Sequence, residues 1–220
     1  MTKIKICGLR TPENALMVAR AGADFIGLNF YPESPRYVEP ALAAEIVACL
    51  REGLGASCPK LVGIFVNASA AEVRAIVERV GLDFAQLSGD EPPETVEALP
   101  GIAFKSIRPH DVKAALAAAK RLAPAFPNSS DAPSILLDAF NPKLYGGTGE
   151  TASLDIAAAL KASVPRLMLA GGLNPDNVAE RARAVKPWGL DVASGVEAGM
   201  PGIKDERAVR AFISAARAAS

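Results

Sequence analysis

Short hydrophobic runs alternate along the whole chain with alanine-rich segments of helical periodicity. Eight runs have the length and the β-branched or aromatic content of buried strands. They span residues 4–7, 25–30, 61–66, 83–87, 103–107, 134–140, 166–170 and 190–194. Strands that alternate with helices are typical of a parallel sheet with helical crossovers. The final segment has a helical pattern, so no ninth strand is predicted.

The segments between the runs carry residues that begin and end helices. Thr11 precedes a proline, which is typical of an N-cap and a first helical position. Ser69, with glutamate three residues later, has the pattern of a capping box, and Gly81 is placed to end that helix. Asn174, also followed by proline, predicts another helix start, and Asp205 is expected to cap the last helix.

Three similar segments indicate a repeated unit of helix end, aspartate and strand: AGADF (21–25), VGLDF (80–84) and WGLDV (188–192). Eight strand–helix units of about 27 residues fill a chain of 220 residues, near the lower size limit of a TIM barrel. A doubly wound open sheet usually has fewer strands and a GxGxxG motif after the first, which CGLR (7–10) lacks. We therefore predict an α/β fold in which residues 1–220 form a single (β/α)8 TIM barrel domain with a closed parallel eight-stranded sheet.

Composition and charge exclude several classes of partner. Half of the residues are hydrophobic, and 24 basic residues balance 24 acidic ones. There is no basic excess for a nucleic acid, no basic amphipathic segment for a membrane surface and no signal-peptide pattern. No apolar run approaches the roughly 20 residues of a membrane span. We expect a cytoplasmic protein with a small-molecule partner, as a monomer or, alternatively, a homodimer.

Cysteine and histidine content argues against a metal centre. Cys7, Cys49 and Cys58 are an odd number at irregular spacing, so they give neither a disulfide framework nor a CxxC pair. His110 is the only histidine, and a triad or a multi-histidine site would depend on it alone. No metal is expected.

In a closed barrel the active site lies at the carboxyl ends of the strands. Cys7 ends the first run, and strand alternation places it on the same inward face as Lys5. A lone cysteine is usually a small core residue, but a nearby ammonium would favour the thiolate and make Cys7 a usable base. Lys5 needs a buried partner, and Asp191 on the neighbouring eighth strand is placed for a structural ion pair.

Asp138 follows the apolar part of the sixth run and precedes a long glycine-rich loop rather than a helix. This position favours a catalytic or ligand-binding carboxylate. Gly171 and Gly172 follow the seventh run, and Ser194 and Gly195 follow the eighth. Backbone N–H groups of these two loops, with a short extra helix, often bind phosphate in barrels, although paired glycines can also be simple turn residues.

Arg36 lies in the loop after the second run, in the segment YPESPRY (31–37), which contains two prolines. A loop arginine is usually solvated, yet a stiff loop would hold a guanidinium in place for a carboxylate, and both interpretations stay open. Asp90 and Glu91 follow the fourth run, where we interpret them as favourable charges at a helix N-terminus.

Several segments together resemble one family. They are KICGL (5–9), GAD (22–24), FYP (30–32), SPRY (34–37), VGIFVN (62–67), QL (86–87) with Gly89 and Glu91, LD (137–138), GGTG (146–149), LAGGLNP (169–175) with NV (177–178), Asp191, SGVE (194–197), PG (201–202) and KD (204–205). These segments cover nearly the whole chain in order. Together they resemble the phosphoribosylanthranilate isomerase family.

The resemblance implies an Amadori rearrangement of N-(5-phosphoribosyl)anthranilate to 1-(2-carboxyphenylamino)-1-deoxyribulose 5-phosphate, a step of tryptophan biosynthesis. It implies Asp138 as general acid and Cys7 as general base on opposite sides of the sugar. Arg36 would hold the anthranilate carboxylate. The phosphate would be held by the backbone at Gly171, Gly172, Ser194 and Gly195. No metal or organic cofactor is implied.

The chain departs from the family at the rim of the barrel. Ser88 stands where the family usually has histidine, and we assign it no catalytic role. Glu150 stands where a lysine is more common, and ASL (152–154) replaces the usual aromatic residue. These changes are expected to affect the fourth strand's rim and the packing of the loop.

The residues at the strand ends also bear on two alternative functions. A related sugar-phosphate isomerase of histidine biosynthesis uses a pair of aspartates, one at the end of the first strand, where this chain has Cys7. A non-catalytic or substrate-shifted phosphate-binding paralogue would be favoured by loss of Cys7, Asp138 or the glycines, all of which are present. Only Ser88 favours that second alternative.

Overall fold

The computed structural model describes residues 1–139 and 153–219. The glycine-rich segment 146–149, Glu150, Ala152 and the end of the sixth predicted run at Phe140 lie outside these described residues.

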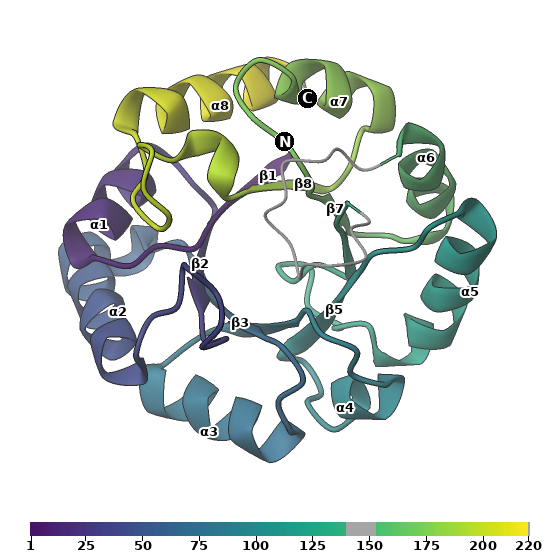
Figure 1. The fold of residues 1–220 in the computed structure, drawn as a ribbon, viewed down its shortest axis with the longest axis horizontal. Coiled ribbons are helices and arrows are strands. Elements are labelled where there is room, and N and C mark those ends of the chain that lie inside the picture. Colours follow the sequence, from purple (N-terminus) through teal and green to yellow (C-terminus); the bar gives the residue numbers. More distant parts are fainter. Residues whose placement is uncertain (140–152, 220) are drawn as a thin grey trace.

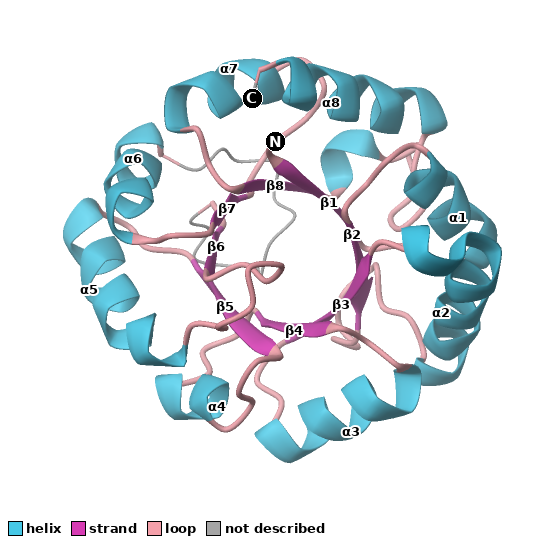
Figure 2. Cartoon of the chain, turned by 180° about the vertical axis from the view of Figure 1, so that it is seen from behind, coloured by secondary structure: helices cyan, strands magenta, loops and turns pink. Residues whose placement is uncertain are grey.

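Eight parallel strands close into a barrel in sequence order, which confirms the predicted fold. The strands are β1 (Lys3–Cys7), β2 (Phe25–Asn29), β3 (Lys60–Phe65), β4 (Phe84–Leu87), β5 (Ala103–Ile107), β6 (Ile135–Leu137), β7 (Leu167–Leu169) and β8 (Gly189–Val192). The helices are α1 (Pro12–Arg20), α2 (Pro40–Leu54), α3 (Ala70–Val80), α4 (Pro93–Glu97), α5 (Val112–Leu122), α6 (Leu154–Ser163), α7 (Val178–Val185) and α8 (Glu206–Ala218). Short 3-10 turns are η1 (Gly55–Ser57), η2 (Ala123–Ala125) and η3 (Ser194–Val196). Figures 1 and 2 show the helices as an outer ring around the strands.

Most of the predicted helix boundaries are confirmed by side-chain hydrogen bonds. Ser69 and Glu72 form both bonds of the capping box, and Gly81 ends α3 with a φ of 80°. Asp205 Oδ1 accepts from the backbone N–H of Ala208 at the start of α8. The predicted start at Asn174 was wrong: α7 begins only at Val178, because the side chain of Asn174 accepts from two backbone N–H groups and holds a turn before the helix.

The alternation of strand side chains separates two apolar regions. Outward residues such as Ile4 and Ile6 pack in the layer between sheet and helices. Inward residues form a second cluster inside the barrel, in which Phe25 contacts Phe84 and Trp188 with ring centroids 6.5 and 5.9 Å apart. Phe25 and Phe84 begin their strands, so these rings close the amino end of the barrel. Each buried ring contributes about 2–3 kcal/mol of hydrophobic free energy.

Within the described part of the chain, no helix combines the length and the apolar character needed to cross a bilayer.

Candidate active site

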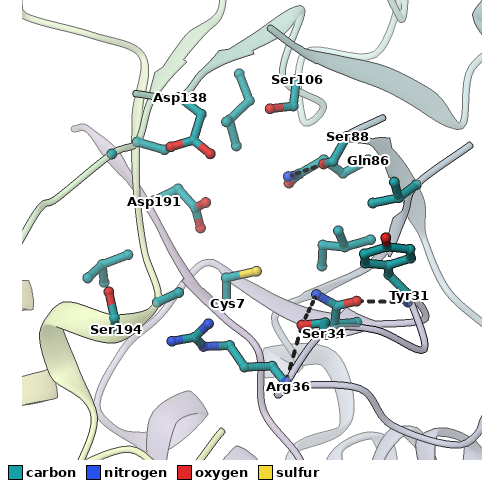
Figure 3. Close-up of a pocket in the computed structure, with 18 of the residues that line it drawn as sticks. Cys7, Tyr31, Ser34, Arg36, Gln86, Ser88, Ser106, Asp138, Asp191 and Ser194 are labelled. Carbon is teal, nitrogen blue, oxygen red and sulfur yellow. Dashed lines mark hydrogen bonds between the residues drawn. The ribbon is translucent and has the colours of Figure 1, made fainter. Parts of the chain in front are cut away.

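A cavity of about 290 Å³ opens at the carboxyl ends of the strands. It brings together most of the residues that the sequence singled out: Cys7, Arg36, Asp138, Gly171, Gly172 and Ser194. In Figure 3 Asp191 lies between Cys7 and Asp138, while Gln86, Ser88 and Ser106 occupy another wall. A cavity of this size and mixed polarity suits a small molecule better than a macromolecule.

The predicted ion pair between Lys5 and Asp191 is present below Cys7. Lys5 Nζ donates to Asp191 Oδ1 at 2.9 Å, and the two residues are partners in the β1–β8 register. Lys5 is fully buried. Burial alone would lower the pKa of Lys5, but the charge of the paired Asp191 carboxylate opposes it, and the net effect is a raised pKa. The pair therefore keeps a buried ammonium beside the thiol.

The net effect on Cys7 differs from the sequence prediction. The Lys5 ammonium does favour the thiolate, but burial acts more strongly in the other direction, so the pKa of the Cys7 thiol lies above its ordinary value. The negative charge of Asp191 adds to this rise. Cys7 is therefore a protonated thiol at neutral pH, and it must lose that proton before it can act as a base.

Asp138 follows β6 and is held by its own backbone. Its Oδ1 accepts from the N–H of Ala139 at 2.8 Å. Burial raises the pKa of the Asp138 carboxyl to about 6, although the Ala139 hydrogen bond opposes the rise, and the nearby charge of Asp191 adds to it. A carboxyl with this pKa can donate a proton near neutral pH, which is a property of general acids in enzymes.

The loops after β7 and β8 meet beside Asp138. Gly171 and Gly172 have φ angles of 85° and 60°, which L side chains rarely adopt. A Cβ on Gly171 would lie 2.6 Å from the Ala139 nitrogen. The predicted short extra helix after β8 is η3, which contains Ser194 and Gly195. Gly171, Gly172 and Ser194 line the cavity, so the backbone there can approach an anion.

Gly195 has a packing role in the structure. It is absent from the cavity lining within the described chain, and a Cβ on it would collide with the Leu173 carbonyl oxygen of the β7–α7 loop. Glycine at this position lets η3 pack directly against that loop. The prediction that the Gly195 backbone itself binds phosphate stays a prediction.

Arg36 is held by a residue whose role the sequence did not reveal. Its Nε and Nη2 donate to the two carboxylate oxygens of Glu197 at 2.8 Å each. Glu197 also accepts from Lys204 Nζ and from the Gly202 N–H, both at 2.8 Å. Burial opposes ionisation of Glu197, but the bonds from Arg36 and Lys204 lower its pKa to about 2. Arg36 therefore lies in a fixed position at the cavity.

Glu91 also has a different role from the one predicted. It is buried, and its Oε2 pairs with Lys105 Nζ at 2.9 Å, while its Oε1 accepts from the N–H groups of Asn67 and Gly89. It ties the ends of β3, β4 and β5 together rather than acting as a helix N-terminal charge. The signal that could have shown this is the lysine within the predicted strand AFKSI (103–107), because a buried lysine needs an anion beside it.

The family model described as N-(5'phosphoribosyl)anthranilate (PRA) isomerase matches residues 4–215. A relative from Geobacter sulfurreducens, named N-(5'-phosphoribosyl)anthranilate isomerase, is 45% identical over 217 residues, which cover 99% of each chain. A relative of the same name from Myxococcus xanthus is 41% identical and covers 98% of this chain and 96% of its own.

Solved structures agree with these relatives. Phosphoribosyl anthranilate isomerase from Thermotoga maritima superposes with a TM-score of 0.84 at 32% identity, covering 99% of this chain and all of that one. A structure of the enzyme in complex with reduced 1-(o-carboxyphenylamino)-1-deoxyribulose 5-phosphate has a TM-score of 0.81 at 31% identity, with 99% and 100% coverage. Sequence, fold and cavity lead to one assignment: the chain belongs to the N-(5'-phosphoribosyl)anthranilate isomerase family.

Proposed function

We propose that this protein converts N-(5'-phosphoribosyl)anthranilate to 1-(2-carboxyphenylamino)-1-deoxyribulose 5-phosphate in tryptophan biosynthesis. The observation that carries the proposal is one cavity lined by Cys7, by Asp138 with its pKa raised to about 6, and by Gly171, Gly172 and Ser194 of two phosphate-type loops. The ligand of a family structure, a reduced form of this product, supports the same substrate.

The chemistry needs one acid and one base. The Asp138 carboxyl gives its proton to the furanose ring oxygen, the C1–O bond breaks, and the nitrogen lone pair forms a protonated Schiff base. The Cys7 thiolate then takes the C2 proton, and the electron pair of that C–H bond forms the C1=C2 bond of an enolamine. Tautomerisation moves the C2 hydroxyl proton and delivers a proton to C1, leaving the C2 ketone of the product.

The remaining groups bind and orient the substrate. Backbone N–H groups at Gly171, Gly172, Ser194 and Gly195 hold the phosphate, and the Arg36 guanidinium holds the anthranilate carboxylate. The steps move protons only and need no metal or organic cofactor. The groups that line the cavity come from one chain, so we propose that residues 1–220 form one catalytic domain and that a monomer suffices. A step of amino-acid biosynthesis also favours a location in the cytoplasm.

The direct test is the loss of anthranilate-substrate fluorescence in the presence of purified protein. Rescue of a tryptophan auxotroph that lacks this isomerase is the parallel test in cells. Turnover and rescue are expected. A purified, folded protein that binds the phosphorylated substrate but leaves it unchanged would instead favour the non-catalytic paralogue.

The pH dependence of kcat/KM follows from the two pKa shifts. The active form has Asp138 protonated and Cys7 ionised, which is one proton fewer than the fully protonated pair. At neutral pH most molecules that have lost one proton from this pair have Asp138 ionised and Cys7 protonated. The reason is that the pKa of Asp138 is about 6, whereas burial raises the pKa of Cys7 above its ordinary value. The active form is a fixed fraction of all molecules in which the pair has lost one proton, so its concentration changes with pH as theirs does. We expect kcat/KM to rise through about pH 6, stay level near neutrality and fall only in alkaline solution.

Initial rates at low substrate concentration across the acid and alkaline range would measure this profile. A rate that falls as the pH rises through 6 would contradict the assignment of Asp138 as acid and Cys7 as base. It would require a base whose pKa is lower than that of Asp138.

Glu197→Gln tests the anchoring of Arg36. The amide cannot accept from both guanidinium nitrogens, so Arg36 loses its forked partner. We expect KM to rise about tenfold with kcat within about twofold of wild type, because a binding group is loosened and not a reacting one. The midpoint of thermal unfolding should also fall, since the buried Lys204 loses its anionic partner.

Glu206→Gln is the matched control, because Glu206 pairs with Arg210 on the surface of α8 with both side chains 56% exposed. The same change there should leave KM and stability unaltered. Equal KM values for Glu197→Gln and wild type would show that Arg36 does not bind the anthranilate carboxylate.

A further inference from the structure

The β4 side of the cavity carries a buried polar group that the proposed steps do not use. Gln86 on β4 is 6% exposed and lines the cavity. Its Nε2 donates to Ser88 Oγ at 3.0 Å, whereas its Oε1 has no hydrogen-bond partner among the described residues. In Figure 3 the amide end of Gln86 points toward the centre of the pocket. Because a buried amide oxygen without a partner is costly, we expect a ligand to supply one.

A second buried oxygen without a partner lies outside the cavity. Ser134 Oγ is the other buried side-chain atom without a partner in the described chain. Ser134 lies immediately before β6, at the amino end of the barrel, and the cavity lining does not include it. Of these two residues, only Gln86 lines the cavity.

The strand order fixes which part of the substrate Gln86 meets. β4 lies opposite β8 in the closed ring of eight strands. Ser194, in the proposed phosphate site, follows β8, and Figure 3 shows Gln86 and Ser88 across the pocket from it. The phosphate is attached to C5 of the sugar, so C1, C2 and the anthranilate nitrogen extend away from Ser194 toward the β4 side.

We propose that Gln86 Oε1 accepts a hydrogen bond from the C1–C2 end of the substrate, an inference that rests on the proposed function. The donors at that end are the anilinic N–H and the C2 hydroxyl. The nitrogen is cationic in the Schiff base, and the C2 hydroxyl is enolic in the enolamine. Each donor is stronger in the intermediate than in the substrate, so the hydrogen bond strengthens along the reaction and lowers its barrier. Ser88 is a positioning residue that fixes the Gln86 amide through Nε2.

Gln86→Met tests the role by keeping the side-chain length and removing the amide. We expect kcat/KM to fall about 10- to 100-fold, mainly through kcat. Ser88→Ala should cost a few-fold in kcat, and it keeps the backbone bond from Ser88 N–H to Phe65 that supports the fold. Ser134→Ala, which removes the other unpartnered oxygen, is the control and should keep wild-type kcat and KM.

The outcomes separate this inference from the proposed function. A wild-type protein without turnover refutes the proposed function. Wild-type turnover with unchanged kcat/KM in both Gln86→Met and Ser88→Ala leaves that function standing and overturns the role of Gln86. If Gln86→Met does not fold, as judged by circular dichroism, Ser88→Ala alone decides, because a wild-type kcat there overturns the proposal.

Ligand binding identifies the donor. The product has a carbonyl at C2, and its reduced form has a hydroxyl there, while both keep the anilinic N–H. If the N–H is the donor, Gln86→Met should weaken both ligands about equally. If the C2 hydroxyl is the donor, only the reduced ligand should bind more weakly. Unchanged dissociation constants for both would contradict the proposal.

Discussion

Asp138→Asn should reduce turnover about 10³-fold, because it removes the proton that opens the furanose ring. The amide has nearly the shape of the carboxyl, and its oxygen can still accept from the Ala139 N–H as the carboxylate does. The phosphate loops and Arg36 are untouched, so the reduced product should bind with nearly wild-type affinity. Steady-state fluorescence kinetics and ligand titration measure the two effects separately. Asp131→Asn, at an exposed loop position, is the matched control and should leave turnover unchanged.

The same variant should be more stable than wild type at neutral pH. The pKa of Asp138 is about 6 in the folded state against an ordinary 3.8. Between these values the unfolded chain releases its proton and the folded chain does not, so the free energy of unfolding falls as the pH rises, by up to about 3 kcal/mol. Below that window the group is protonated in both states and contributes nothing. Asparagine carries no charge and should not show the decline.

Chemical denaturation of both proteins on either side of this pH window would measure the difference. A turnover near the wild-type value in Asp138→Asn would remove Asp138 from the acid role. Equal stabilities in neutral solution would instead mean that the carboxyl is not held at a raised pKa.

The strand pattern predicts which residues of the site lie close together, because the order of strands in a barrel follows their order in the sequence. Once eight strands close in order, the first and eighth are neighbours, so the pairing of Lys5 with Asp191 follows from the sequence alone. The same rule placed Cys7 and Asp138 at one end of the sheet. These predictions needed only the period of the strands and the closure of the ring.

Other features depend on quantities that a linear pattern does not contain. The sign of the Cys7 pKa shift depends on whether burial or the Lys5 charge is stronger, and burial is known only after packing. The pair between Arg36 and Glu197 joins two loops that are 161 residues apart. The late start of α7 arises from the turn that Asn174 and Asn177 hold together. The first two outcomes depend on tertiary contacts, and the third depends on a local turn that competes with the helix start.

Cys7→Ser should also reduce turnover by about 10³-fold, and its cause differs from that of Asp138→Asn. A serine hydroxyl does not ionise in the accessible pH range, so no base is available for the C2 proton, whereas the change in size is small. Ring opening by Asp138 can still occur, so rapid-quench analysis of the variant should show the Schiff base accumulating before the enolamine. Cys49→Ser, which removes a thiol on α2, is the control and should keep wild-type rates.

The result that would contradict this role is a Cys7→Ser variant with wild-type turnover. Asp191 would then be the remaining candidate for the base, since it lines the same cavity and its charge acts on both Cys7 and Asp138. Its Oδ1 already accepts a hydrogen bond from the Lys5 ammonium, so only its other carboxylate oxygen would be available to take the C2 proton. Comparing Cys7→Ser with Asp191→Asn would therefore decide between a base on β1 and a base on β8: the variant that loses proton abstraction but still opens the ring identifies the residue that removes the C2 proton.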